Sequence, residues 1–302
     1  MIKEIIITHS GEFAALLTAF LWAFTVISFE YAAKIVGSLA VNIIRLAEAF
    51  LLLTLFSWIY RGIPFPVDAS MHAWIWLFIS GITGFSIGDL FLMKAFVIIG
   101  GRVSMLIYSA VPVITALLSW IFLNEVLSVH HISGMIITIS GIIMVILTRQ
   151  KGQFNIKFNY PLSGILFALC GTLGQSVGLV LSKYGMGTYS AFSATQIRIL
   201  AGLIGFIILF FPLKAWPKVN QAVRNRIAMR YTAIGAVFGP FLGVSFSLIA
   251  IKNTAIGIAS TIMSIVPIII IPLSVIIFKE KVKFKEIIGA VIAVCGVYIM
   301  FL

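Results

Sequence analysis

Charged residues are scarce in this chain. Asp, Glu, Lys and Arg make up 10% of its 302 residues, whereas an average soluble domain has about 25%. Hydrophobic residues make up 61%, and a soluble domain of this size has no core large enough to bury them all. The composition therefore excludes an ordinary soluble enzyme or nucleic-acid-binding domain. It indicates a membrane protein that has the lipid bilayer as its main partner.

Cysteines and catalytic motifs are also few or absent. The two cysteines, Cys170 and Cys295, fall inside apolar runs, so we expect packing residues and no disulfide framework. The sequence has no HExxH, Walker or CxxC motif, and the adjacent His130 and His131 do not share a helix face. We therefore expect no enzyme activity, no metal site and no cofactor. The first residues lack a cleavage site after an apolar region, so we also expect no signal-peptide processing.

Long apolar runs are the main feature that is present. A bilayer core is crossed by roughly 20 apolar residues in a helix. The runs are continuous instead of alternating, which favours helices over barrel strands. Division at charges, prolines and glycines predicts an all-α membrane protein of ten transmembrane helices: 11–33, 39–60, 71–98, 103–122, 131–148, 161–183, 190–211, 229–251, 257–278 and 284–302.

The chain contains an internal repeat. The stretch SAVPVITALLSWIFLNE, which begins at Ser109, returns 155 residues later as SIVPIIIIPLSVIIFKE, which begins at Ser264. A shift of 153 residues relates Arg45 to Arg198. The basic segment Arg149–Lys157 separates the two copies.

We assign residues 1–150 to a first five-helix repeat and residues 158–302 to a second one. Because five is an odd number, the second copy must cross the membrane in the opposite sense. Two inverted repeats of this kind are typical of secondary transporters.

Several residues carry a resemblance to a known family. They are Trp22, Arg45, Arg198, Pro112, Glu125, Pro267, Glu280, Gly134, Gly141, Gly289 and Gly296. On the basis of these residues, the sequence resembles the drug/metabolite transporter superfamily, in particular its EamA-like members with two five-span units. The resemblance covers almost the whole chain. The resemblance implies export of amino acids or related metabolites, driven by a gradient, since no ATP-binding sequence is present. The tryptophan is not repeated, because Thr172 or a neighbour stands at its place in the second half.

Two prolines lie near the middle of predicted spans. Pro112 and Pro267 each remove one helical hydrogen bond, so the carbonyls four residues earlier lose their partners. In a membrane such carbonyls face neighbouring protein or a water-filled cavity. The alternative is a simple packed kink. Substrate-binding candidates at these helix breaks are Tyr108, Ser109, Met263 and Ser264.

Asp89 is the acidic residue that we place deepest inside a span. Burying its charge costs at least about 2.5–3.5 kcal/mol, so an intramembrane carboxylate suggests function. It could take part in proton or ion coupling, bind a cationic group of the substrate, or serve as a structural contact. Its equivalent in the second half is Val244, so any coupling role would be asymmetric.

Other charged residues stand closer to the predicted membrane faces. Arg45 and Glu48 have i,i+3 spacing, and Glu30 and Lys34 have i,i+4 spacing. The two opposite charges of each pair could therefore neutralise each other. The alternative is a gate or an anion contact, in which Arg198 would act symmetrically with Arg45. We expect Glu125 and Glu280 to mark helix ends. Trp22, Gln175 and Ser245 complete the candidate substrate-binding residues.

The distribution of positive charge predicts the orientation. Of the 21 Lys and Arg residues, 14 follow odd-numbered spans and 4 lie on the other side. The positive-inside rule then places both termini outside a cell membrane that the chain crosses many times. We predict a secondary transporter of a small-molecule substrate that works by alternating access. The alternative is a membrane channel or a non-transporting scaffold, and no feature indicates an oligomeric state.

Overall fold

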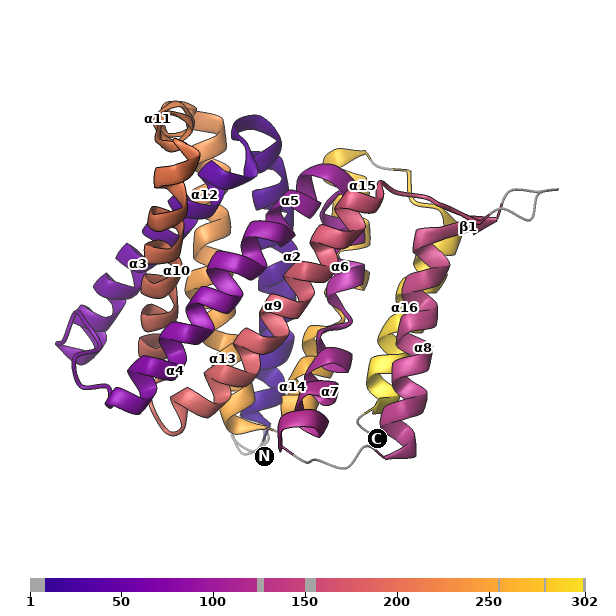
Figure 1. Cartoon of the computed structure of the whole chain (residues 1–302), viewed down its shortest axis with the longest axis horizontal. Coiled ribbons are helices and arrows are strands. Elements are labelled where there is room, and N and C mark those ends of the chain that lie inside the picture. Colours follow the sequence, from indigo (N-terminus) through magenta and orange to yellow (C-terminus); the bar gives the residue numbers. More distant parts are fainter. Residues whose placement is uncertain (1–8, 124–127, 150–155, 255, 280, 301–302) are drawn as a thin grey trace.

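A computed structural model describes residues 9–123, 128–149, 156–254, 256–279 and 281–300. Glu125 and Glu280, which we expected at helix ends, lie outside the described residues. Figure 1 shows a bundle of long helices with a short two-stranded sheet at one edge. The first half contains α2 (Ser10–Val36), α3 (Ser38–Arg61), α4 (Met71–Gly81), the π-helix η1 (Ile82–Gly88), α5 (Asp89–Ile99), α6 (Gly101–Tyr108), α7 (Val111–Leu123) and α8 (Val129–Ile146).

The second half repeats this order with one added helix. Strands β1 (Leu147–Arg149) and β2 (Ile156–Phe158) pair antiparallel between the halves. The second half contains α9 (Leu162–Met186), α10 (Ala191–Leu213), α11 (Trp216–Arg224), α12 (Arg226–Ala236), the π-helix η2 (Val237–Gly243), α13 (Val244–Asn253), α14 (Ile256–Met263), α15 (Val266–Phe278) and α16 (Phe284–Met300).

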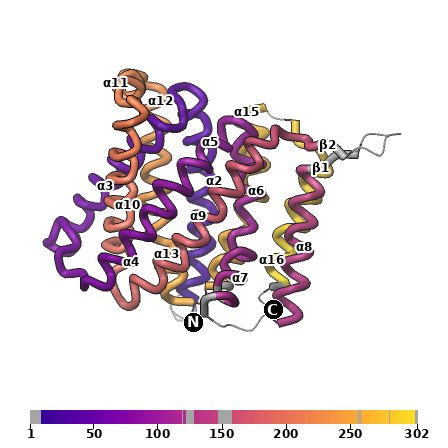
Figure 2. Tube along the Cα trace, in the orientation of Figure 1, coloured from indigo at the N-terminus to yellow at the C-terminus, as the bar shows by residue number. Residues whose placement is uncertain are grey.

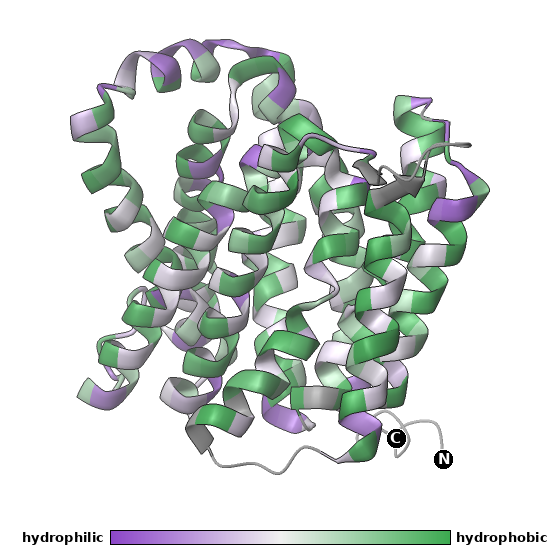
Figure 3. Cartoon of the chain, turned by 45° about the vertical axis from the view of Figure 1, so that its right-hand side comes forward, coloured by the Kyte–Doolittle hydropathy of each residue, from purple (hydrophilic) through white to green (hydrophobic). Residues whose placement is uncertain are grey.

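The predicted all-α membrane fold is confirmed. Among the described residues, 9 helical segments are long and apolar enough to cross a membrane, each with at least 18 residues. Helix α16 stands at the tenth predicted span, but it has 17 described residues and is not among them. Figure 3 shows apolar residues along most of the helix length and hydrophilic residues gathered toward the ends of the bundle.

The sequence repeat is visible in where the helices begin and end. Helix α6 and helix α14 end at Tyr108 and Met263, which are 155 residues apart. The two π-helices end at Gly88 and Gly243, also 155 residues apart. Positions related by the sequence offset therefore have the same place in the two halves.

The two halves are intertwined. Helix α2 of the first half packs against α12, α13, α14 and α15 of the second. Helix α9 of the second half packs in turn against α4, η1, α5, α6 and α7 of the first, and Figure 2 shows both helices running through the middle of the bundle. Gly174 of α9 allows a close approach, because a Cβ atom there would lie 2.7 Å from the Cα atom of Gly88.

The last helix of each half lies against its counterpart. Helices α8 and α16 run side by side at one edge of the bundle (Figure 1). At Gly141 a Cβ atom would lie 2.5 Å from the backbone nitrogen of Ala293, so a larger residue would force the two helices apart. Small residues at such contacts are what allow helices to associate closely in lipid.

Candidate functional site

Two interrupted helices meet near the centre of the bundle. Helix α6 ends at Tyr108 and α7 begins at Val111, while α14 ends at Met263 and α15 begins at Val266. Each interruption comes directly before the proline that the sequence singled out. The backbone is thus released from regular helix at equivalent places in the two halves.

The serines at the interruptions bond back to their own helices. The Ser109 hydroxyl donates to the carbonyl of Leu106 at 2.6 Å, and the Ser264 hydroxyl donates to the carbonyl of Thr261 at 2.7 Å. Both hydroxyl hydrogens are therefore used within the protein. The oxygens can still accept a hydrogen bond from a ligand.

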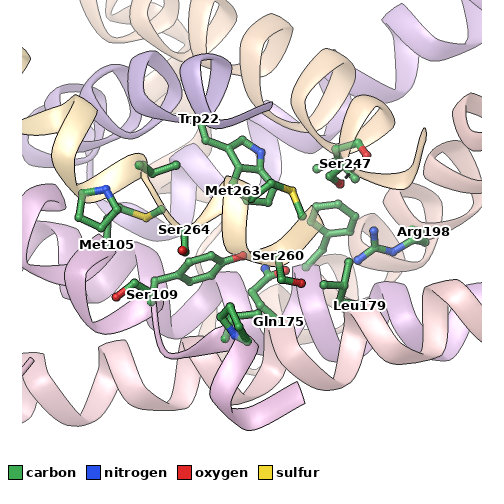
Figure 4. Close-up of a pocket in the computed structure, with 17 residues that line it drawn as sticks. Trp22, Met105, Ser109, Gln175, Leu179, Arg198, Ser247, Ser260, Met263 and Ser264 are labelled. Carbon is green, nitrogen blue, oxygen red and sulfur yellow. Dashed lines mark hydrogen bonds between the residues drawn. The ribbon is translucent and has the colours of Figure 1, made fainter. Parts of the chain in front are cut away.

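A cavity lies between these interruptions and contains about 610 Å³ of atom-free space, part of it in its opening. Its walls are mainly apolar, with a few polar groups, as ligand pockets usually are. Figure 4 shows the side chains converging on it. Its lining consists of Trp22, Phe85, Met105, Tyr108, Ser109, Val111, Pro112, Gln175, Leu179, Arg198, Val244, Ser247, Ser260, Met263, Ser264, Val266 and Pro267.

A second cavity shares a wall with the first. It includes Arg45 and Asp89, and the two cavities have Trp22, Phe85, Met105, Tyr108, Gln175 and Val244 in common. We call the first cavity the Arg198 lobe and the second the Arg45 lobe. They are adjacent parts of one site at the junction of the two halves.

The Arg45 lobe holds an internally balanced charge cluster. The Arg45 guanidinium donates to the Asp89 carboxylate at 2.5 Å, and the Gln175 amide donates to its other oxygen at 2.6 Å. Arg45 also donates to the Asn42 side chain at 3.0 and 3.1 Å. Arg45 and Asp89 are 4% and 7% exposed, so the ion pair lies away from solvent. Each charge offsets the cost of burying the other.

Asp89 owes its position to an irregular segment that the sequence did not predict. The π-helix η1 ends at Gly88, and Asp89 is the first residue of the α-helix that follows. A π-helical turn inserts an extra residue and changes the direction of the side chains after it, and such turns are frequent at functional sites. The glycine pairs Gly84–Gly88 and Gly239–Gly243 lie within the two π-helices.

Arg198 is buried without a carboxylate partner in the described part of the chain. Its side chain is 3% exposed, and its Nε atom has no hydrogen-bond partner. Its guanidinium contacts the ring of Phe85, whose centroid is 5.0 Å away. In Figure 4, Arg198 extends from its helix toward the cavity, on whose walls Ser260 and Gln175 also lie.

The predicted pairing of Arg45 with Glu48 is wrong. Arg45 pairs with Asp89 from another helix, and the Glu48 Oε2 atom is buried without a partner. The predicted pair of Glu30 and Lys34 is present, with 2.6 Å between Oε1 and Nζ. Glu30 also accepts a hydrogen bond from the backbone nitrogen of Gly101 at 2.8 Å.

The structure places most of the predicted substrate-binding residues on the cavity walls. Trp22, Tyr108, Ser109, Gln175, Met263 and Ser264 line the Arg198 lobe, and Asp89 lines the Arg45 lobe. Ser245 lines neither; it is fully buried and donates to the carbonyl of Phe241 at 2.6 Å. Ser247 lines the Arg198 lobe instead. The repeat could also have pointed to Ser260, which lies 155 residues after the cavity residue Met105.

Gln175, and not Thr172, stands where the tryptophan would repeat. The offset of 153 residues that relates Arg45 to Arg198 also relates Trp22 to Gln175. Both residues line both lobes, whereas the Thr172 hydroxyl bonds back to the carbonyl of Ala168 at 2.7 Å. The expected packing role of Cys170 and Cys295 is also wrong, since both side chains are exposed on the outside of the bundle.

A polar cluster joins the two halves at one end of the bundle. Asp68, in the turn between α3 and α4, forms an ion pair with Arg61 and accepts a hydrogen bond from the Tyr189 hydroxyl at 2.8 Å. Tyr189 belongs to the turn between α9 and α10. Partial burial opposes ionisation of Asp68, but the hydrogen bonds from Tyr189 and Arg61 outweigh it and lower the pKa of the carboxyl.

The arrangement defines a class of membrane protein. Two repeated halves, each with an interrupted helix, enclose a mainly apolar cavity with buried charges inside a bundle of membrane-spanning helices, which is the architecture of a multi-pass transporter. Comparison with known proteins agrees and gives the family. The family model of the EamA-like transporter family matches residues 9–147 and again residues 162–302, so the chain belongs to this family.

Relatives and a solved structure are consistent with this assignment. An uncharacterized transporter of Archaeoglobus fulgidus is 21% identical over 94% of this chain and 96% of its own length. The uncharacterized transporter YetK of Bacillus subtilis is 21% identical over 84% of this chain and 74% of its own. A crystal structure at 16% identity covers 97% of this chain and 96% of the other, with a TM-score of 0.64, and has the same fold.

Proposed function

We propose that this membrane transporter is a secondary transporter that exports amino acids or related small polar metabolites by alternating access. The observation that carries the proposal is the cavity between the two interrupted helices, where both halves contribute walls and buried polar groups. Cavities at the interface of repeats and beside broken helices are where secondary transporters bind their substrates.

The proposed movement is a rocking of two units about this cavity. The units are the repeats, residues 1–150 and 158–302, with α2 and α9 exchanged, because each of these helices packs mainly against the other repeat. The breaks that precede Pro112 and Pro267 would act as hinges, because the chain there has left regular helix on both sides. Arg45 and Asp89 would anchor the first unit through their ion pair, and Glu48 and Arg198 would be the remaining charges of a gate.

Counterflow in proteoliposomes tests the proposal. Vesicles with the purified protein are loaded with unlabelled amino acids, sugars or organic cations, and uptake of the labelled compound is followed. We expect transient, saturable accumulation for at least one small polar metabolite. Flux that does not saturate would indicate a channel instead, and no flux for any compound class would contradict a transport function and leave a scaffold.

We also propose that both termini lie outside the cell. The beginning of α2 and the end of α16 are at the same end of the bundle, and the basic segment around α11 is at the other (Figure 1). Single cysteines at His9 and Lys218, in a variant with Cys170 and Cys295 replaced by serine, should be labelled by an impermeant reagent at His9 alone. Labelling at Lys218 alone would reverse the assignment.

A further inference from the structure

The two arginines of the site occupy equivalent places but have different surroundings. Helices α3 and α10 begin at Ser38 and Ala191, 153 residues apart, and the same offset relates Arg45 to Arg198. Both guanidiniums contact the same aromatic ring, because the centroid of Phe85 lies 6.0 Å from Arg45 and 5.0 Å from Arg198. The site therefore contains two buried cations on either side of its shared wall.

The carboxylate that balances Arg45 has no counterpart for Arg198. Asp89 is the first residue after η1, and the first residue after η2 is Val244, 155 residues later. Val244 lines the cavity together with Arg198. Where the first half places a carboxylate opposite its arginine, the second half thus places an apolar side chain.

The second partner of Asp89 is replaced in the same way. Gln175 donates to Asp89 in the Arg45 lobe, and its equivalent in the other half is Trp22. A Cβ atom on Gly243, next to Val244, would lie 2.8 Å from the indole ring of Trp22, so Trp22 is close to this place. An Asp–Gln pair in one half is therefore replaced by a Val–Trp pair in the other, and Arg198 forms no ion pair within the described part of the chain.

The net charge of the lining is consequently positive. Among the described residues that line the two lobes, the charged ones are Arg45, Asp89 and Arg198, which gives two positive charges and one negative. A buried charge without a partner is costly, and a guanidinium binds a carboxylate well through two parallel hydrogen bonds. The Arg198 lobe thus lacks one carboxylate.

We infer that the substrate supplies this carboxylate: Arg198 binds the carboxylate group of an organic anion in the place that Asp89 occupies in the other half. The walls contributed by Trp22, Met105, Leu179 and Met263 suit an apolar body. The carboxylate of Asp89 already accepts hydrogen bonds from Arg45 and Gln175. The described lining residues therefore include no other acidic group that could bind an amine. The carboxylate, and not an amino group, is the required feature.

This inference rests on the proposed transport function, but it can be tested by binding alone. Three matched sets of compounds separate the groups: alanine, propionate and ethylamine; leucine, 4-methylpentanoate and isopentylamine; phenylalanine, 3-phenylpropionate and phenethylamine. Binding to the purified full-length protein is measured by ligand-induced thermal stabilisation and calorimetry at pH 7. We expect carboxylates of at least one set to bind with or without the amino group, and the amines not to bind.

Substitutions at the two equivalent positions provide the decisive comparison. Arg198→Gln should weaken carboxylate binding about 10- to 100-fold, as expected for hydrogen bonds to a charged group. Val244→Asp should weaken it as much, because the new carboxylate pairs with Arg198 as Asp89 does with Arg45. This variant should remain folded, since the added charge is balanced. The matched neutral variant Val244→Asn has nearly the same shape without the charge, so it should weaken carboxylate binding at least about fivefold less than Val244→Asp does.

Three outcomes of the binding experiments would overturn the inference. The first is binding of the amines but not the carboxylates, and the second is binding of no compound in any set. The third is equal loss in Val244→Asp and Val244→Asn, which would point to the shape of the site and not to charge. Counterflow of a sugar or an organic cation would support the proposed transport function and reject the carboxylate site. Carboxylate binding without any flux would support the carboxylate site and reject the transport function.

Discussion

The ion pair between Arg45 and Asp89 determines the electrostatics of the site at the scale of single residues. Each charge lies in the bundle interior, where an isolated ion is unfavourable, and the structure satisfies Asp89 with a second donor from Gln175. The residue is therefore first a structural partner, and a role in proton coupling requires that the pair opens during transport.

We predict that Asp89→Asn lowers stability by about 3–5 kcal/mol, because it leaves Arg45 buried without a balancing charge. The unfolding midpoint of the purified protein measures the change. The double variant Asp89→Asn with Arg45→Gln should be more stable than Asp89→Asn alone, since it removes both charges. Equal losses in the two variants would contradict the pairing, and unchanged pH dependence of transport in Asp89→Asn would reject proton coupling through this residue.

The residue that pairs with Arg45 illustrates what the sequence could predict. Helical spacing identifies neighbours on one helix, so it proposed Glu48, three residues away. The true partner comes from another helix and is oriented by a π-helix, which no spacing rule indicated. The repeat did better, because it relates positions across the whole chain: it anticipated both helix breaks and the contrast between Asp89 and Val244.

The interrupted helices are the main feature at the scale of elements. Each break precedes a proline that cannot donate its backbone hydrogen bond, so the chain leaves the helix within two residues. Because both breaks border the cavity, a change in their backbone conformation would directly alter the cavity walls. A proline elsewhere in the same helix should matter much less.

We predict that Pro112→Ala slows counterflow by about tenfold or more, because the restored N–H allows a more continuous helix and stiffens the hinge. Its unfolding midpoint should stay the same or rise. Pro272→Ala is the matched control: Pro272 lies inside α15 and away from the cavity walls, so transport should change less than about twofold. Equal effects of the two variants on transport would argue against the hinge.

The polar cluster of Arg61, Asp68 and Tyr189 belongs to the scale of the whole molecule, because it connects turns from both halves. Its carboxyl has a lowered pKa. The contribution of Asp68 to stability is therefore complete above its ordinary pKa of 3.8 and is lost as the pH falls through the lower value of the folded state. Between pH 5 and 8 the cluster should stay closed.

We predict that Asp68→Asn has a lower unfolding midpoint than the unchanged protein at pH 7, and that the two midpoints approach each other as the pH falls below 3.8. The reason is that acid protonates the carboxyl that the variant already lacks. Tyr189→Phe, which removes one of the two donors, should show a smaller difference at pH 7. A difference between Asp68→Asn and the unchanged protein that does not shrink as the pH falls below 3.8 would show that the ion pair is not its cause.

The path of α2 has a consequence for how the protein is made. This helix is synthesised and enters the membrane before the other described helices, yet many of its packing partners, α12, α13, α14 and α15, come from the last third of the chain. During translation Thr18 and Thr25 must therefore face lipid or other helices until these partners are made. Each hydroxyl can then still donate to a carbonyl of its own helix, as it does in the structure at 2.8 Å. A chain that ends at the boundary between the repeats should therefore have an incomplete fold, because α2 lacks these packing partners.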